Sequence, residues 1–141
     1  MKVIVPDASV LLKWVLPGPE EADTEAALAL RLAAVQEDIR LIVPPLWLFE
    51  VGNTLARKFP KQAPALIDSI LSFGLETVEM DSVWLEKTLA LTSEFGVTFY
   101  DAAYHALAIV THGTFITADR RYMTRTEKAG HVMHLGDWRS Q

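Results

Sequence analysis

The sequence predicts an α/β protein in which a central, mostly parallel sheet of four or five strands lies between two layers of helices. Two observations predict this fold class. Short β-branched, apolar segments alternate along the chain with longer amphipathic segments of helical character. Strands and helices in alternation form a parallel sheet that is covered on both faces. The length of 141 residues, without a repeat or a long linker, predicts a single domain over residues 1–141.

The strands are predicted from short apolar runs that end in turn residues. Residues 2–5 contain three successive β-branched residues and stop at Pro6-Asp7, and residues 41–43 stop at Pro44-Pro45. Three further strands are expected at residues 76–80, 114–118 and 131–135.

Helical segments fill the intervals between these strands. A short helix over residues 9–16 is expected to stop at Pro17-Gly18-Pro19. Residues 20–36 are rich in Ala and Leu and carry acids in the first turn, where the helix dipole favours negative charge. The remaining helices are expected at residues 46–58, 63–73, 82–94 and 98–111, with a short basic helical segment before the last strand.

Composition excludes several classes of protein. Half of the residues are apolar and 22% are charged, which argues against disorder. The absence of cysteine excludes a disulfide framework and a thiolate metal site, so a bound metal would have oxygen or imidazole ligands. The apolar start is too short for a signal peptide, and no apolar run approaches the ~20 residues that span a bilayer. These features predict a soluble, cytoplasmic protein.

Four acidic residues border hydrophobic sequence: Asp7, Glu50, Asp101 and Asp119. Burying a bare carboxylate is costly unless a positive charge meets it, and the same segments contain no Lys or Arg to do so. A shared divalent cation would solve this problem. Asp7 and Asp119 each follow a predicted strand, and ligands of open parallel sheets bind beyond the carboxyl ends of the strands. The two acids are therefore expected at one edge of the sheet.

Each acid also has a structural explanation. Asp7 and Asp119 stand where they would cap the helices that follow them. Thr98 and Asp101 have the spacing of a capping box, and a carboxylate in the first turn is stabilised by the dipole. Glu50 begins a polar helix face, which predicts a solvated stripe as the alternative to a site. These explanations account for the acids one at a time and leave their recurrence at βα junctions unexplained.

The remaining charges and the histidines give weaker signals. A net charge of −5 argues against nucleic-acid binding through overall charge, yet basic residues cluster after Glu50 and after Asp119. These clusters are either solvated surface or a rim that contacts phosphates. The candidates for RNA contact are Arg57, Lys58, Arg120 and Arg121. The four histidines have no ligand spacing, and His105 is expected on a helix surface.

Four segments together resemble the PIN-domain ribonucleases, above all the toxin halves of VapBC-type toxin–antitoxin pairs. They are residues 5–9 (VPDAS), 49–53 (FEVGN), 100–108 (YDAAYHALA) and 116–119 (ITAD). The resemblance extends over essentially the whole chain, and its specificity comes from the four segments in combination.

The resemblance implies a function and a set of site residues. It implies hydrolysis of RNA phosphodiester bonds by a water that Mg²⁺ or Mn²⁺ activates, in a homodimer that a small antitoxin protein neutralises. The acidic cluster that holds the metal matches Asp7, Glu50, Asp101 and Asp119. The polar positions that accompany it match Ser9, Asn53 and Thr117.

Other functions stay open at this point. A PIN-domain nuclease without a toxin role, acting in RNA processing, would have the same residues. So would a metal-dependent phosphatase, a DNA nuclease, or an interaction module that keeps the acids without catalysis. A phospho-receiver module also gathers acids at strand ends, but it requires a Lys at a late strand end, where this sequence has Asp119.

Overall fold

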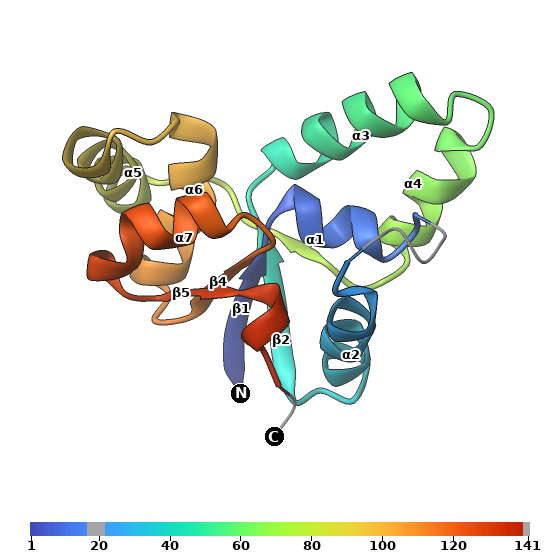
Figure 1. Ribbon diagram of the computed structural model, residues 1–141, viewed down its shortest axis with the longest axis horizontal. Helices are drawn as coiled ribbons and strands as arrows, with labels where there is room; N and C mark the ends of the chain where they lie inside the picture. Colours follow the sequence, from blue (N-terminus) through green and yellow to red (C-terminus); the bar gives the residue numbers. More distant parts are fainter. Residues whose placement is uncertain (17–21, 140–141) are drawn as a thin grey trace.

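The computed structural model describes residues 1–16 and 22–139, which form a five-stranded sheet between two layers of helices (Figure 1). All strand pairs are parallel, in the order β3-β2-β1-β4-β5. The strands are β1 (Lys2–Pro6), β2 (Ile39–Val43), β3 (Glu76–Thr77), β4 (Thr114–Thr117) and β5 (Val132–His134). The expected fold class, a parallel α/β/α sandwich with four or five strands, is confirmed.

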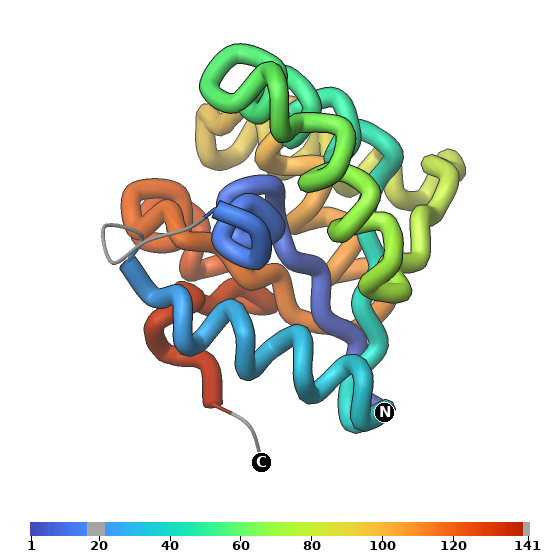
Figure 2. The backbone as a smooth tube through the Cα atoms, turned by 90° about the vertical axis from the view of Figure 1, so that its right-hand side faces the viewer, coloured from blue at the N-terminus to red at the C-terminus, as the bar shows by residue number. Residues whose placement is uncertain are grey.

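The helices lie in two layers on opposite faces of the sheet, as right-handed crossovers place them when the strand order reverses at β1 (Figure 1). The first layer contains α1 (Ala8–Lys13), α2 (Thr24–Val35), α3 (Leu46–Lys58) and α4 (Ala63–Leu71). The second contains α5 (Ser82–Phe95), α6 (Phe99–Val110) and α7 (Arg120–Thr126). Figure 2 looks onto the first layer, with α1 between α2 and the α3–α4 pair. Two 3₁₀ turns, η1 (Glu127–Ala129) and η2 (Leu135–Asp137), flank β5. No helix in the described ranges is long and apolar enough to cross a membrane.

The core is centred on β1 and β4, the two middle strands. Val5 and Ile116 are fully buried, and α6 packs on both strands through an unbroken buried run, residues 102–108. Alanines in that run bring the helix close to the sheet. Fully burying a side chain such as Val5 contributes about 1.5–3 kcal/mol. The position of Asp101, one residue before the run, is therefore fixed by a helix that is buried against the two middle strands.

The first two helices depart furthest from their expected bounds. The expected helix over residues 20–36 begins only at Thr24, because Asp23 has left-handed backbone (φ 61°). Glu25 keeps an acid in the first turn, while Glu20, Glu21 and the Pro17-Gly18-Pro19 stop lie outside the described residues. The helix expected over residues 9–16 has its last α-helical residue at Lys13.

The third strand is shorter than the expected residues 76–80. Only Glu76 and Thr77 are in strand conformation, with one further backbone bond from Val78 N to Val43 O (3.0 Å). β2, its neighbour, ends at Val43 and is followed by two prolines, so the later residues have no backbone to pair with.

Candidate active site

Asp7 stands at the carboxyl end of β1, where the chain turns into α1. Its backbone N–H donates to the Ile116 carbonyl of β4 (3.2 Å), and its side chain caps α1 by accepting from Val10 N (3.2 Å). Two further donors reach the same carboxylate and leave one lone-pair position of Oδ2 open. Ser9 Oγ donates to Oδ1, and Thr117 Oγ1 donates to Oδ2 at 2.6 Å. The carboxylate is buried and held by three donors.

The ends of β1 and β4 are joined by side-chain hydrogen bonds. Thr117 Oγ1, which donates to Asp7, also accepts from Asp119 N (3.0 Å), and Ser9 Oγ accepts from Ala118 N (3.3 Å). Asp119 caps α7 by accepting from the backbone N–H groups of the two residues after Arg120, at 3.0 and 3.1 Å. The caps expected from the sequence are therefore present, and the structure places Ser9 and Thr117 in contact with the acids.

Glu50 enters the site from α3 and is held by Tyr104, which is not among the predicted site residues. Tyr104 Oη donates to Glu50 Oε1 at 2.7 Å. Tyr104 is buried and lies on α6, three residues after Asp101. It therefore ties the first helical layer to the second at the site. A tyrosine three residues after an acid on one helix was the only sequence signal for this role.

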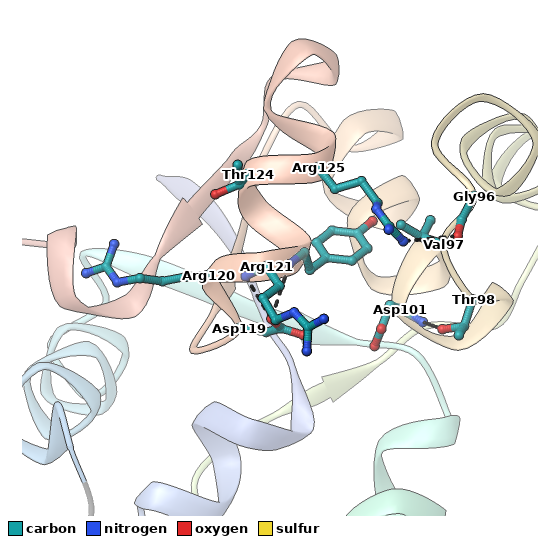
Figure 3. A pocket seen from close by; sticks show the side chains of 10 residues that line it. Gly96, Val97, Thr98, Asp101, Asp119, Arg120, Arg121, Thr124 and Arg125 are labelled. Atoms are coloured by element: carbon teal, nitrogen blue, oxygen red, sulfur yellow. Dashed lines mark hydrogen bonds between the residues drawn. The ribbon is translucent and has the colours of Figure 1, made fainter.

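Asp101 lies in the first turn of α6, whose N-cap is Thr98. Thr98 Oγ1 accepts from Asp101 N (3.2 Å), which confirms the capping geometry. The Asp101 side chain is half-buried and faces Asp119 across the mouth of a pocket (Figure 3).

The acids lie close enough to repel one another. Burial is the main cause that raises the pKa of Asp7, of Glu50 and of Asp101. The negative charge of Asp101 raises the pKa of both Asp7 and Glu50 further, and Asp119 does the same to Asp101. Hydrogen bonds from Ser9 and Thr117 lower the pKa of Asp7 but do not outweigh burial. The four acids thus form one electrostatically coupled cluster.

The cluster is suited to a hard divalent cation by its donor chemistry. Its ligand atoms are carboxylate oxygens, which Mg²⁺ and Mn²⁺ prefer, and in the described ranges no Lys or Arg forms an ion pair with any of the four acids. In the part of the chain that the structure describes, no three His, Asp or Glu side chains are already arranged around one point as a finished ligand set. A cation would therefore draw the half-buried Glu50 and Asp101 toward Asp7, or reach them through water.

Some of the expected site residues lie apart from the acids. Asn53 is exposed and makes no hydrogen bond to the four acids in the described structure. Arg57 and Lys58 are exposed at the end of α3. Arg120 and Arg121, in contrast, line the pocket that Asp101 and Asp119 share.

The expectation that His105 lies on a helix surface is wrong. Its side chain is fully buried, with Nε2 donating to the Gly130 carbonyl (2.7 Å) and Nδ1 2.9 Å from the Tyr122 hydroxyl. Because the carbonyl can only accept, Nε2 carries the proton and Nδ1 accepts from Tyr122. Burial lowers the pKa of His105 and favours this neutral form. The histidine anchors α7 to α6 and so positions the cap residue Asp119.

A family model described as "PIN domain" matches residues 4–129 of the chain. The chain therefore belongs to the PIN-domain family, a family of nucleases. A search of curated proteins gave no match.

Solved structures share this fold over nearly the whole chain. VapBC2 of Rickettsia felis, bound to a promoter DNA fragment, is similar with a TM-score of 0.70 at 13% identity, over 94% of this chain and 96% of that one. A protein of Pyrobaculum aerophilum is similar with a TM-score of 0.68 at 21% identity, over 96% and 90%. The sarcin–ricin loop cleaving toxin VapC20 of Mycobacterium tuberculosis has a TM-score of 0.65 at 16% identity, over 92% and 96%.

Proposed function

We propose that this chain is a metal-dependent endoribonuclease that hydrolyses RNA phosphodiester bonds, and that it acts in the cytoplasm as the toxin of a VapBC-like pair. One observation supports the nuclease proposal above all others. In a PIN-domain chain, four acids at β1, α3, α6 and β4 lie together at the carboxyl edge of the sheet, and no Lys or Arg among the described residues forms an ion pair with them. Such a cluster is costly to maintain for stability alone.

Asp7 and Asp101 would be the principal ligands of Mg²⁺ or Mn²⁺, and Asp119 and Glu50 would complete the site directly or through water. A bound ion supplies charge for the phosphodiester and lowers the pKa of a water that can attack it. The chain's own residues fix the ligands. Ser9 and Thr117 hold the Asp7 carboxylate, and Asn53 is an exposed candidate for orienting water or RNA.

The toxin role is supported by similar folds among solved toxin–antitoxin complexes, including VapBC of Salmonella typhimurium. It is supported as well by aromatic side chains left exposed beside two of the acids. Phe49 is 78% exposed next to Glu50, and Tyr100 is 64% exposed next to Asp101. Exposed aromatic groups beside a polar site are typical of surfaces that bind protein partners. We propose an antitoxin and a second copy of the chain as those partners.

Substitution of the two principal ligands tests the nuclease proposal. Asp7→Asn and Asp101→Asn keep shape and size but remove the charge, so each should reduce the rate of RNA cleavage in Mg²⁺ by roughly 100-fold or more, at least as much as loss of an outer partner of a metal site. The assay compares RNA, single-stranded DNA and a generic phosphate ester, with EDTA as a further control. Cleavage of RNA by folded D7N at the wild-type rate would contradict the proposal.

The partner proposals need a separate measurement. Light scattering of the isolated chain should give twice the 15.7 kDa of one chain if the homodimer forms. Inhibition of RNA cleavage by the product of a short neighbouring gene would support the toxin role. A nuclease that no such protein inhibits would instead favour a function in RNA processing.

A further inference from the structure

A pocket of about 670 Å³ opens directly beside the acid cluster. The turn between α5 and α6, residues 96–98, forms one wall, and α7 forms the other. Asp101 and Asp119 stand on the border that the pocket shares with the cluster (Figure 3). The volume lies within the range of sites that hold a small ligand, roughly 300–1,000 Å³. The opening therefore lies directly beside any phosphodiester that is bound at the four acids.

The charge of the pocket wall is opposite to that of the cluster. Arg121 and Arg125 extend over the opening, while Arg120 points away from it (Figure 3). Arg125 Nη1 lies 3.4 Å from the Gly96 carbonyl, which orients the guanidinium across the pocket. One contact leaves most of the five guanidinium donors free. Within the described ranges, neither arginine forms an ion pair with a carboxylate.

We propose that this pocket binds the nucleotide next to the scissile phosphodiester of a single-stranded RNA. Arg125 and Arg121 hold the phosphate of that nucleotide, and its base rests against Val97 within reach of the Thr98 hydroxyl. The inference rests on the proposed ribonuclease function and names its substrate class. Guanidinium groups with free donors bind phosphate in a fixed, two-pronged geometry.

Two features favour RNA without a paired strand as the occupant. The pocket is continuous with the place where the reacting phosphodiester must lie, so the adjacent nucleotide has to be close to it. A base can enter the space between residues 96–98 and α7 only when it has left a helical stack, and proteins commonly read such unstacked bases in single-stranded RNA. The arginines also offset the repulsion that the acids exert on an approaching strand.

The test measures RNA binding in the full-length D7N chain, so that cleavage does not interfere. The probe is a fluorescent single-stranded oligouridylate, titrated by anisotropy at several salt concentrations. Adding Arg125→Gln should weaken binding by about 2- to 10-fold, the size of one hydrogen-bonded contact. It should also make the slope of log affinity against log salt shallower by about 0.7, the value for one phosphate contact on a single strand.

Arg139→Gln in the same D7N chain is the matched control. Arg139 is exposed and also donates to a backbone carbonyl, that of Gly136 (2.7 Å). It lines a different pocket with Lys2 and Ile39, at the amino ends of β1 and β2, so it should change neither affinity nor slope. An RNA duplex of equal length should bind more weakly than the single strand and should lose less affinity with R125Q.

Three results would overturn the subsite. The first is a slope of log affinity against log salt in R125Q that equals that of its D7N parent. The second is an effect of R139Q as large as that of R125Q. The third is loss of binding to an acidic peptide in R125Q with RNA binding unchanged, which would assign the pocket to a protein partner. A different result would contradict the ribonuclease function itself. That result is the absence of RNA cleavage by the wild-type chain in Mg²⁺, whatever the D7N binding data show.

Discussion

Asp7 accepts hydrogen bonds from Ser9, Val10 and Thr117, and its pKa is nevertheless raised. Three donors would ordinarily hold a carboxylate in its charged form. Burial outweighs them here, and the neighbouring charge of Asp101 adds to its effect. Ionised Asp7 therefore costs the folded protein free energy at neutral pH, and either a proton or a cation relieves that cost. This residue links stability to metal binding.

The pH dependence of stability should show this cost. A raised folded-state pKa means that the free energy of unfolding contributed by Asp7 is present below its ordinary pKa, 3.8, and is lost as pH rises through the folded-state value. Urea unfolding of wild type and D7N in EDTA should thus give a difference that moves in favour of D7N as pH increases from about 4 to 7. A difference that is constant over this range would show that Asp7 is not destabilised by burial.

Tyr104 is the positioning residue for Glu50. Tyr104→Phe removes the donor to Glu50 Oε1, which should cost about 1 kcal/mol of stability. Because this bond lowers the pKa of Glu50, its loss should raise that pKa further and move the acid limb of the cleavage–pH profile to higher pH. Tyr100→Phe is the control, since Tyr100 is on the same helix, is exposed and makes no hydrogen bond in the described structure. An unchanged profile in Y104F would remove Tyr104 from the site.

The sequence predicts single site residues well where local rules apply, and poorly where contacts are distant. Asp7 and Asp119 could be placed at an edge because β-branched runs mark the strands before them. The contact between Tyr104 and Glu50 could not be predicted, because it joins residues 54 positions apart on helices of different layers. His105 was misassigned because its partners lie on α7 and at Gly130, and nothing on its own helix indicates them.

At the scale of the element, α7 depends on its cap. The helix has only seven residues, and Asp119 Oδ1 accepts from its Arg121 and Tyr122 N–H groups. Asp119 thus has two roles, as cap and as proposed member of the cation site. Substitutions can separate them, because Asn is as good an N-cap as Asp and Ala is a poor one.

Asp119→Asn should leave the free energy of unfolding within about 0.5 kcal/mol of wild type, whereas Asp119→Ala should lower it by about 1 kcal/mol. Both should slow RNA cleavage, because both remove the charge. Urea unfolding and the cleavage assay together give the result. D119N with wild-type activity would assign the residue to capping alone.

The bounds of a helix or strand could be predicted where the residues that set them lie within or directly beside that element. The helices from Leu46, Ala63 and Ser82 begin at the expected residues. In the structure, two prolines precede the first, Pro64 lies in the first turn of the second, and Asp81 caps the third. The length of β3 was not predictable, since it depends on where β2 ends rather than on its own residues. The start of α2 depends on the left-handed conformation of Asp23, which could not be predicted from the surrounding residues.

At the scale of the whole molecule, the order in which the chain adds strands to the sheet brings the site residues together. Chain connections run from β1 outward to β2 and β3, then return across the sheet to β4 beside β1. Asp7 and Thr117 are 110 residues apart in the sequence and 2.6 Å apart between hydrogen-bonded atoms for this reason. Ligand sites of open parallel sheets form where the winding reverses. The alternation of strands and helices predicted the sheet, and the order of its strands explains why two of the acids meet.

Calorimetric titration of Mn²⁺ into the full chain tests most directly whether the acids form a cation site. Near neutral pH, wild type should bind saturably, and D7N and D101N should bind at least about 10-fold more weakly. Protons compete with the cation for the carboxylates, so wild-type affinity should fall as pH is lowered. Because the pKa values of Asp7, Glu50 and Asp101 are raised, this fall should begin at a higher pH than it would for carboxylates with ordinary pKa values. Absence of Mn²⁺ binding in wild type, or equal binding in D7N, would contradict the cation site and the hydrolytic function proposed for it.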